Sequence, residues 1–258
     1  MTKGQVAIIG YGYVGKAMHK IFPNALVYDV NMGSQDEVNE KAELAIICVP
    51  TPSKEDGFCD TSVVEEMIGW LKTPLILIKS TIPPGTTEKL KEKYQKRFCF
   101  SPEYIGEGKY AIPPWKYPDP EDPRFHGFLI IGGARPDAER ITQIFQRRLG
   151  PDTVYRITDS KTAELTKYME NAWLATKVIF CNEFYDIAEK FGVSYAELRE
   201  LWLLDPRVGR MHTAVFADER GFGGKCLPKD VSAIIKAALT AGYDPKLLKA
   251  VFNKSKEY

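Results

Sequence analysis

A glycine-rich segment that contains a cysteine is the part of the sequence best suited to covalent chemistry. Residues 221–230 read Gly-Phe-Gly-Gly-Lys-Cys-Leu-Pro-Lys-Asp. The glycines let the backbone approach a ligand closely or adopt positive φ. Pro228 is typical of the first residue of a helix, so the Cys226 thiol is expected beside the positive end of that helix, where a thiolate is favoured. Asp230 falls near the same face, which makes this a candidate site for covalent catalysis.

The same cysteine has a plainer interpretation. A cysteine near the start of a helix is more often a small buried hydrophobic residue than a nucleophile. The glycines favour the catalytic interpretation without deciding between the two. The five cysteines, at positions 48, 59, 99, 181 and 226, form no CxxC pair, and there are three histidines. We therefore expect reduced thiols, a cytoplasmic protein and no metal site.

A second motif, near the N-terminus, predicts dinucleotide binding. The apolar run over residues 5–10 leads into Gly10-Tyr-Gly12-Tyr-Val-Gly15, and a helical pattern follows to about Phe22. Strand, G-x-G-x-x-G and helix in that order bring the backbone up to a pyrophosphate at the helix N-terminus. Asp29 ends the next strand, 19 residues after Gly10. Its carboxylate suits the adenosine ribose hydroxyls and would repel the extra phosphate of NADP, so the pattern indicates NAD.

The segments that follow alternate between short apolar runs and helical patterns. Strands are expected over residues 44–49, 75–78, 97–100, 128–133 and 153–156, and helices over 61–71, 86–95 and 137–149. This alternation predicts an α/β fold with a doubly wound parallel sheet of the Rossmann type. Turns such as Pro50-Thr51-Pro52 would cross the carboxyl edge of the sheet, where ligands of open α/β sheets bind.

A helical region is expected after the sheet. Asp159 or Ser160 would cap a helix that runs to about Phe191, twice the usual length. Lys167 and Asn171 share one face of that helix, although a helical lysine on its own is typical of a solvated surface. The apolar stripe beside them comprises Leu165, Tyr168, Ala172, Ala175 and Ile179. We predict an NAD-binding domain over residues 1–158 and an all-helical dimerisation domain over residues 159–258.

Composition narrows the classes of function. The chain has 258 residues, of which 44% are hydrophobic and 27% charged, and its net charge is +1. These values are typical of a soluble globular protein with a substantial core. They give no case for binding nucleic acid or an anionic membrane surface. The apolar runs are also too short to span a bilayer.

Taken in order, these segments resemble the UDP-glucose/GDP-mannose dehydrogenase family. Each motif alone is weak, whereas seven in the family's order, spread over residues 5 to 253, are a specific signal. They lie at residues 10–15, 48–52, 80–87, 101–104 with 107–108, 163–167 with 171–172 and 182–183, 207–209, and 221–230. The resemblance implies oxidation of the C6 alcohol of a nucleotide sugar to a carboxylate, with two NAD consumed per turnover.

The resemblance also implies roles for individual residues in the reaction. Cys226 would trap the intermediate aldehyde as a thiohemiacetal, whose oxidation gives a thioester that water hydrolyses. Lys167 and Asn171 would stabilise the developing oxyanion. The remaining catalytic residues would handle protons within hydrogen-bond reach, and they are Asp230, Glu103 and Thr81, the last through a water that it holds.

Binding roles follow from the same resemblance. The residues implied to contact the sugar nucleotide are Glu103, Tyr104, Lys167, Asn171, Arg207, Phe222 and Gly223. Arg207 would reach the sugar across a homodimer formed through the long helix 160–191. The residues implied to contact NAD are Gly10, Gly12, Tyr13, Val14, Gly15, Asp29, Val49, Pro50, Thr51, Ser80, Thr81 and Glu107.

The sequence departs from the family's pattern in three places. Family members carry a third domain, which holds much of the nucleotide, and its linker would begin near Asn253. Lys225 replaces a small residue before the cysteine. The stretch 111–120 looks longer than the family's loop, and the proline-rich region 105–125 around it is either a surface excursion or a lid over the site. Much of the binding energy for a nucleotide sugar comes from parts that do not react, so loss of the third domain would weaken kcat/KM.

Three interpretations of function are open at this point. The first is the two-step nucleotide-sugar dehydrogenase, with a separate chain supplying the missing domain or with reduced activity as a partial enzyme. The second is a single-step NAD-dependent dehydrogenase of a smaller hydroxy substrate, which needs Lys167 and Asn171 but not Cys226. The third is a catalytically silent NAD-binding dimer.

Overall fold

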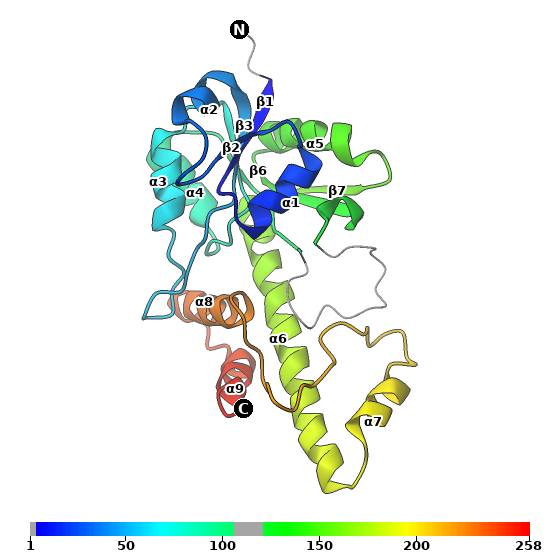
Figure 1. Cartoon of the computed structure of the whole chain (residues 1–258). Coiled ribbons are helices and arrows are strands. Elements are labelled where there is room, and N and C mark those ends of the chain that lie inside the picture. The colour runs from blue at the N-terminus through cyan, green and yellow to red at the C-terminus, as the bar shows by residue number, and fades with distance from the viewer. Residues whose placement is uncertain (1–3, 106–120) are drawn as a thin grey trace. The chain divides into compact units, whose positions relative to one another are not determined.

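The computed structural model describes residues 4–105 and 121–258 (Figure 1). The described residues divide into two compact units, one of residues 4–105 and 121–167 and the other of residues 168–258. The last strand ends at Thr158 and the long helix begins at Ser160, so the division between the units falls inside that helix. The domain boundary at residue 158 stays a prediction.

The described strands of the first unit form a single sheet in the order β2-β1-β3-β4-β5-β6-β7. They are β1 (Gln5–Ile9), β2 (Leu26–Tyr28), β3 (Ala42–Ile47), β4 (Leu75–Ile78), β5 (Phe98–Phe100), β6 (Phe128–Gly133) and β7 (Val154–Thr158). The chain passes from β1 outward to β2 and then returns to β3 on the other side of β1. The carboxyl ends of β1 and β3 therefore flank the switch point at which such sheets bind ligands.

Helices cover both faces of this sheet (Figure 1). Ile46 of β3 packs in the cluster formed with α1 (Tyr13–Ile21) and α5 (Arg135–Leu149). Its neighbour Ile47 points the opposite way, because side chains alternate along a strand. Ile47 packs in the cluster formed with α2 (Gln35–Lys41), α3 (Ser62–Trp70) and α4 (Thr86–Tyr94). The predicted doubly wound sheet is confirmed.

Strand β6 departs from the predicted parallel arrangement. It pairs antiparallel with β5, so that Cys99 lies opposite Gly133, whereas β7 is parallel to β6. Two parallel neighbours need a long crossover connection, usually a helix. Between β5 and β6, the described residues contain only the short 3-10 turn η1 (Pro123–Phe125). The apolar run of β6 therefore predicts a strand without giving its direction.

The described part of the second unit is all helical, as predicted. The helix α6 (Ser160–Lys190) has 31 residues, and α7 (Tyr195–Trp202), α8 (Leu227–Thr240) and α9 (Lys246–Ser255) follow it. Asp159 is the cap of α6, because its carboxylate accepts a 2.9 Å hydrogen bond from the backbone N–H of Thr162. Across residues 4–105 and 121–258, none of the helices combines the length and apolarity that crossing a membrane requires.

The apolar stripe predicted on α6 is correct for four of its five members. Tyr168, Ala172, Ala175 and Ile179 are buried, but 43% of the Leu165 surface is exposed. Leu165 lies four residues before Met169, and residues four apart share a face. Met169 is itself exposed, so Leu165 belongs to a second apolar face of the helix.

A buried carboxylate fixes the first turn of α6 in the sheet unit. Glu164 is fully buried and accepts hydrogen bonds from the backbone N–H groups of Gly85 and Thr87, the second at 2.8 Å. The Thr87 hydroxyl donates a third bond at 2.6 Å. Both N–H groups lie at the N-terminus of α4, where the first backbone donors lack partners and negative charge is stabilised. Glu164 thus ties α6 to the segment that follows β4.

We predict that Glu164→Ala lowers the free energy of unfolding by about 2–4 kcal/mol, because buried donors that lose their acceptor keep their desolvation cost. Urea denaturation followed by tryptophan fluorescence measures the change. Glu92→Ala, at an exposed position of α4, is the matched control and should change stability by less than about 0.5 kcal/mol. Equal losses in the two variants would contradict the anchoring role of Glu164.

Candidate active site

The glycine motif after β1 has the geometry that a dinucleotide requires. Gly10 has a φ of +93°, a conformation that favours glycine. A Cβ on Gly15 would lie 2.0 Å from the carbonyl oxygen of Gly10, so no side chain fits there. At Gly12, the N-cap of α1, nothing lies within 4 Å of the Cβ position. The backbone at the start of α1 is therefore open to a phosphate group.

The acidic residue after β2 lies beside this motif. The Asp29 carboxylate accepts hydrogen bonds from the backbone N–H groups of Tyr11, at 2.5 Å, and Val30, at 2.6 Å. The residue is only half-buried, so its oxygens can also accept from the hydroxyls of a ribose. Tyr13 is exposed and donates its hydroxyl to Glu121 at 2.5 Å, and Val14 packs against the core under α1. These residues fit an adenosine and pyrophosphate at this edge.

The turns after β3 and β4 carry five more of the residues predicted to contact NAD. The Ser80 hydroxyl donates to the carbonyl oxygen of Val49 at 2.7 Å, and the Thr51 hydroxyl donates to that of Thr81 at 2.8 Å. Pro50, which lies between Val49 and Thr51 in the sequence, is exposed. Val49, Pro50, Thr51, Ser80 and Thr81 thus form one cross-linked pair of turns at the carboxyl edge of the sheet. Glu107 lies outside the described residues. The contacts of Glu107 and of these five turn residues with NAD stay predictions.

Glu103, in the turn after β5, is brought together with Lys167 of α6. The Lys167 ammonium donates a 2.6 Å hydrogen bond to the backbone oxygen of Glu103, and it lies 3.7 Å from the Glu103 carboxylate. The other carboxylate oxygen accepts from the backbone N–H of Ile105. Lys167 also lies 5.8 Å from the centre of the Tyr104 ring. Lys167 is buried, so it is not a solvated surface lysine.

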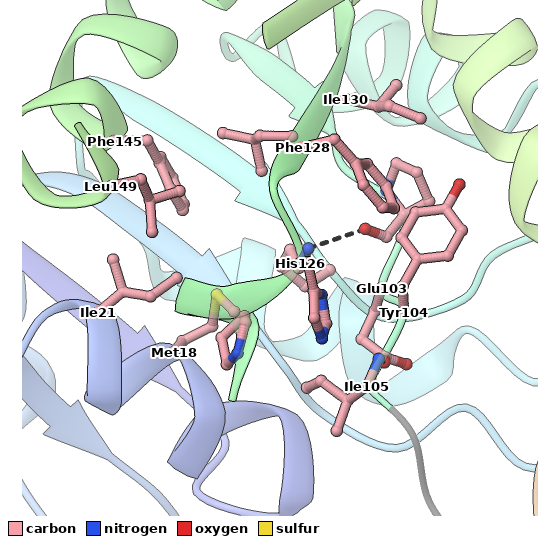
Figure 2. A pocket seen from close by; sticks show the side chains of 14 residues that line it. Met18, Ile21, Glu103, Tyr104, Ile105, His126, Phe128, Ile130, Phe145 and Leu149 are labelled. Carbon is pink, nitrogen blue, oxygen red and sulfur yellow. Dashed lines mark hydrogen bonds between the residues drawn. The ribbon is translucent and has the colours of Figure 1, made fainter. Parts of the chain in front are cut away.

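Lys79 completes this cluster and was not singled out by sequence. Its ammonium donates to the carbonyl oxygen of Pro102 at 2.9 Å and to the Ser101 hydroxyl at 3.3 Å. Burial lowers the pKa of Lys79 to about 8, against the opposing effect of Glu103. The only signal in the sequence is its position directly after a continuous apolar strand. Lys79 also lines a pocket of the sheet unit, where Figure 2 shows Glu103 and Tyr104 beside Phe128 of β6.

The second unit holds a separate set of predicted catalytic residues. The side-chain amide of Asn171 donates to the Asp230 carboxylate at 2.5 Å, and both residues are buried. Lys229, which sequence analysis did not single out, places its ammonium 2.5 Å from the other Asp230 oxygen. A buried carboxylate held by an amide and an ammonium has a fixed orientation. Asn171 follows Lys167 by four residues on α6, so the two side chains share a face.

Cys226 has the exposure that a nucleophile needs. It is the N-cap of α8 and is exposed, whereas Cys48, Cys59, Cys99 and Cys181 are buried. The interpretation as small buried hydrophobic residues therefore applies to those four. Because α8 begins at Leu227, Pro228 is its second residue and not its first as predicted, which the first turn of a helix also tolerates.

The glycine loop before Cys226 is open on one side and anchored on the other. Nothing lies within 4 Å of a Cβ position on Gly223 or Gly224, so the backbone there is accessible to a ligand. Phe222, predicted to line the substrate site, packs its ring in the helical core near Phe252, and its contact with a substrate stays a prediction. Its backbone N–H donates to the Ser255 hydroxyl at 3.0 Å. The structure thus gives Phe222 a part in holding the loop.

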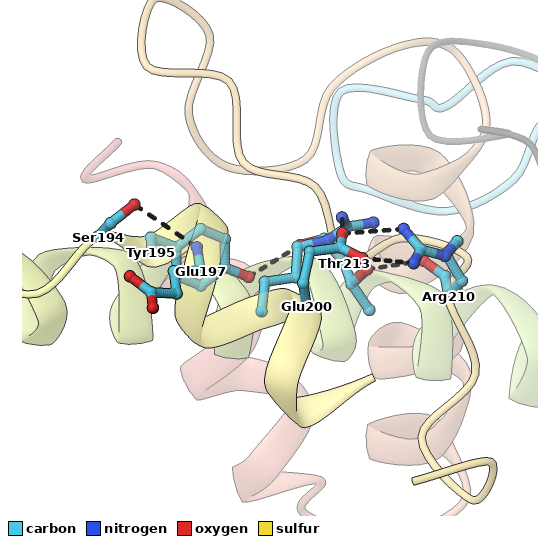
Figure 3. A network of polar contacts seen from close by, with 7 residues as sticks. Ser194, Tyr195, Glu197, Glu200, Arg210 and Thr213 are labelled. Atoms are coloured by element: carbon cyan, nitrogen blue, oxygen red, sulfur yellow. Dashed lines mark hydrogen bonds and ion pairs between the residues drawn. The ribbon is translucent and has the colours of Figure 1, made fainter. Parts of the chain in front are cut away.

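Arg207 is held within its own loop after α7. Its guanidinium binds the Asp205 carboxylate at 2.5 Å, and 88% of its side-chain surface is exposed. The end of the same loop is fixed to α7 by the polar network in Figure 3, where Arg210 pairs with Glu200 at 2.6 Å. Tyr195 donates its hydroxyl to the Thr213 carbonyl at 2.8 Å. The reach of Arg207 across a dimer stays a prediction.

Two profiles of one family match the chain. The profile of the UDP-glucose/GDP-mannose dehydrogenase family, NAD binding domain, matches residues 25–113, and that of the central domain matches residues 161–256. The chain belongs to the UDP-glucose/GDP-mannose dehydrogenase family. The NAD-binding domain confirms the predicted cofactor, and the residues after β1 and β2 fit it.

Curated relatives agree with this assignment. The UDP-glucose 6-dehydrogenase of Rickettsia bellii is 36% identical over 235 residues, which is 86% of this chain and 51% of the relative. The UDP-glucose 6-dehydrogenase of Pseudomonas aeruginosa is 34% identical over 81% of this chain and 48% of its own length. The chain therefore spans about half the length of the curated relatives it matches.

Solved structures share the fold. A UDP-glucose dehydrogenase from Pyrobaculum islandicum superposes with a TM-score of 0.81 and 26% identity, over 99% of this chain and 68% of that one. A UDP-D-ManNAc dehydrogenase from Pyrococcus horikoshii superposes with a TM-score of 0.79 and 24% identity, over 98% of this chain and 68% of that one. The second likeness is evidence for the fold alone.

We predict that Asp29→Ser weakens NAD binding by about 10-fold or more, because a hydrogen bond to a charged group contributes about 1.5–3 kcal/mol. Binding of NADP should be weakened less or improved, since the repulsion of its extra phosphate is removed. Isothermal titration calorimetry with both nucleotides measures the two affinities. Asp36→Ser, an exposed acid in the first turn of α2, is the control. Unchanged NAD affinity in Asp29→Ser would rule out the ribose contact.

Proposed function

We propose that the chain catalyses the NAD-dependent oxidation of the C6 alcohol of a nucleotide sugar, of the UDP-glucose type, to the uronic acid. The observation that carries the proposal is the exposed Cys226 at the start of α8, four residues before a buried Asp230 that is bonded to Asn171. Membership of the family supports the reaction class, and relatives named UDP-glucose 6-dehydrogenase support the sugar. NAD supplies the acceptor for the two hydrides that leave the substrate carbon.

The protein's own groups would act on protons and on the oxyanion in the first oxidation. As a hydride leaves C6, the hydroxyl proton must pass to a base within hydrogen-bond reach. Asp230 is a suitable carboxylate, because Lys229 and Asn171 fix its orientation. The ammonium of Lys167 and the amide of Asn171 would stabilise negative charge on the substrate oxygen. The product of this step is an aldehyde.

The second oxidation would use the cysteine. The Cys226 thiolate adds to the aldehyde carbon, and the carbonyl oxygen becomes an oxyanion that Lys167 and Asn171 stabilise. Loss of a second hydride from that carbon gives a thioester. Water then attacks the thioester, the carbon–sulfur bond breaks, and the thiolate and the carboxylate are released. We assign Glu103 and a water bound by Thr81 to the proton transfers of this hydrolysis.

We predict that Cys226→Ala abolishes formation of the uronic acid, because no thioester can form, and leaves at most one NADH per sugar. NADH absorbance and a chromatographic assay for the acid measure the two steps. Cys181→Ala removes a buried thiol from α6 and should keep both steps. Iodoacetamide should inactivate the wild type and Cys181→Ala alike. Unchanged acid formation by Cys226→Ala would reject the covalent mechanism.

A homodimer through α6 is the second part of the proposal. Exposed apolar side chains of the second unit follow one face of this helix at spacings typical of a helical stripe, namely Met169, Trp173, Phe180, Phe184, Ile187 and Phe191. Trp202 of α7 extends this face, with its ring 5.7 Å from that of Phe180. A contiguous exposed apolar face of this kind marks an interaction site. A symmetric pairing of this face with itself would cover it in both copies.

We predict that the double substitution Trp173→Glu and Phe184→Glu weakens the dimer by at least about 30-fold, because losing aromatic anchors at an interface costs about 2 kcal/mol or more. Sedimentation velocity over a range of concentrations measures the dissociation constant. Glu189→Lys changes an exposed polar position of α6 and serves as the control. A monomeric wild type at all concentrations would contradict the proposed dimer.

A separate chain that supplies the nucleotide-holding domain and a cytoplasmic location stay predictions. The cytoplasmic location rests on the cysteine content alone. Neither is needed for the chemistry of Cys226.

A further inference from the structure

We propose that Lys79 is a positioning residue that holds the turn bearing Glu103 in the geometry the reaction needs. The proposal rests on the proposed function only in that Glu103 is given a part in proton transfer. Its structural content, that Lys79 fixes this turn, stands on the contacts of the sheet unit and can be tested without turnover.

Two lysine ammonium groups bind the two carbonyl oxygens on either side of Glu103. Lys79 donates to the oxygen of Pro102 at 2.9 Å, and Lys167 donates to the oxygen of Glu103 itself at 2.6 Å. Lys79 also donates to the Ser101 hydroxyl at 3.3 Å. The peptide planes before and after Glu103 are thus each fixed by a cation. When Lys167 turns to a substrate oxyanion, Lys79 is the cation that keeps the turn in place.

The position of Lys79 is itself rigid. Its backbone N–H donates to the carbonyl oxygen of Ile47 at 2.9 Å, so Lys79 continues the ladder between β3 and β4. Only 5% of its surface is exposed. Burying an ammonium group is costly unless it is paired and hydrogen-bonded. Here the compensation comes from the oxygens of the Glu103 turn, so the charge and the turn stabilise each other.

The charged groups around Lys79 determine the pH range in which its ammonium group binds the Glu103 turn. Burial lowers the pKa of Lys79 most, Glu103 raises it and Lys167 lowers it further, and the result is about 8. Cys48, at the end of β3, also faces it, but burial raises the pKa of that thiol to about 12, so it stays neutral. As the pH rises through about 8, Lys79 loses its proton and its charge-assisted bonds. The Glu103 turn should therefore loosen in this range.

The first test is hydrogen exchange of the peptide 99–105, corrected for intrinsic exchange rates. At pH 7, the amide hydrogens of this peptide should exchange about 10-fold or more faster in Lys79→Met than in the wild type, since losing the anchor exposes them. At pH 9.5 the wild type should approach the variant. Lys79→Arg should stay protected at both pH values, because a guanidinium keeps its charge. Lys93→Met, an exposed lysine of α4, is the matched control.

The second test is turnover with a UDP-sugar and NAD. Lys79→Met should lower kcat by about 10- to 100-fold with little change in KM, as expected for a misplaced reacting group. It should also lack the fall in rate above about pH 8 that we expect for the wild type. A residue that only aids folding would lower the active fraction and leave the shape of the pH profile unchanged.

The outcomes separate this proposal from the proposed function. Wild-type exchange of peptide 99–105 in Lys79→Met would overturn the role of Lys79, whatever the turnover. Absence of turnover in the wild type would count against the proposed function, and the exchange data would still decide on Lys79. If Lys79→Met does not fold, Lys79→Gln takes its place, and wild-type exchange of peptide 99–105 in that variant at pH 7 would overturn the proposal.

Discussion

The structure depends on one buried carboxylate, that of Glu164 at the N-terminus of α4. It ties the first turn of α6 to the segment after β4, whose own turn carries Ser80 and Thr81. Lys167 is three residues further along α6, and its ammonium is thereby delivered to the backbone of Glu103. The same helix continues to Asn171 and into the second unit. A single anchored helix therefore supplies the residues proposed to bind the oxyanion.

Some side chains are proposed to react, and other side chains hold these in position. The side chains proposed to react are short and lie on a helix or at its start, namely those of Cys226, Asp230 and Asn171. Each unit has a lysine with such a holding contact: Lys79 binds the turn of Glu103 in the first unit, and Lys229 pairs with Asp230 in the second. Buried cations of this kind fix an orientation only when their partners are also fixed.

The reaction steps and the binding of the substrate depend on different groups. The described residues contain the cysteine, the amide, the lysine and the carboxylates that the two oxidations would use. Binding energy from parts of a substrate that do not react is what an enzyme spends on orientation. The described residues therefore account for the proposed reaction steps, whereas the non-reacting parts of a nucleotide sugar would supply the binding energy that orients it.

Much of the fold could be predicted from local patterns. Continuous apolar runs indicated the parallel strands, and the glycine spacing with Asp29 indicated NAD. The direction of β6 could not be predicted, because an apolar run indicates a buried strand and not the direction in which it runs. The helix α2 was missed, since Val38 is its only buried residue and gives no periodicity.

Residues of the candidate site could be predicted where the residue type itself suits the proposed reaction. They were missed where only burial in the fold distinguishes them from ordinary surface residues. Cys226 and Asp230 stand out through their types and spacing. Lys79 and Lys229 were missed because a lysine is usually solvated, and only tertiary packing shows that these two are not. Phe222 was expected at the substrate for its place in the loop; its ring packs in the helical core, and its substrate contact stays a prediction.

The most direct measurement of the central claim is the stoichiometry of NADH. The purified protein is mixed with NAD and a panel of UDP- and GDP-sugars, and NADH is counted per sugar consumed. We expect two NADH per sugar with one of these sugars, and loss of this activity after alkylation of Cys226. One NADH per sugar that is insensitive to alkylation would contradict it, as would NAD binding without turnover of any sugar even at high concentration.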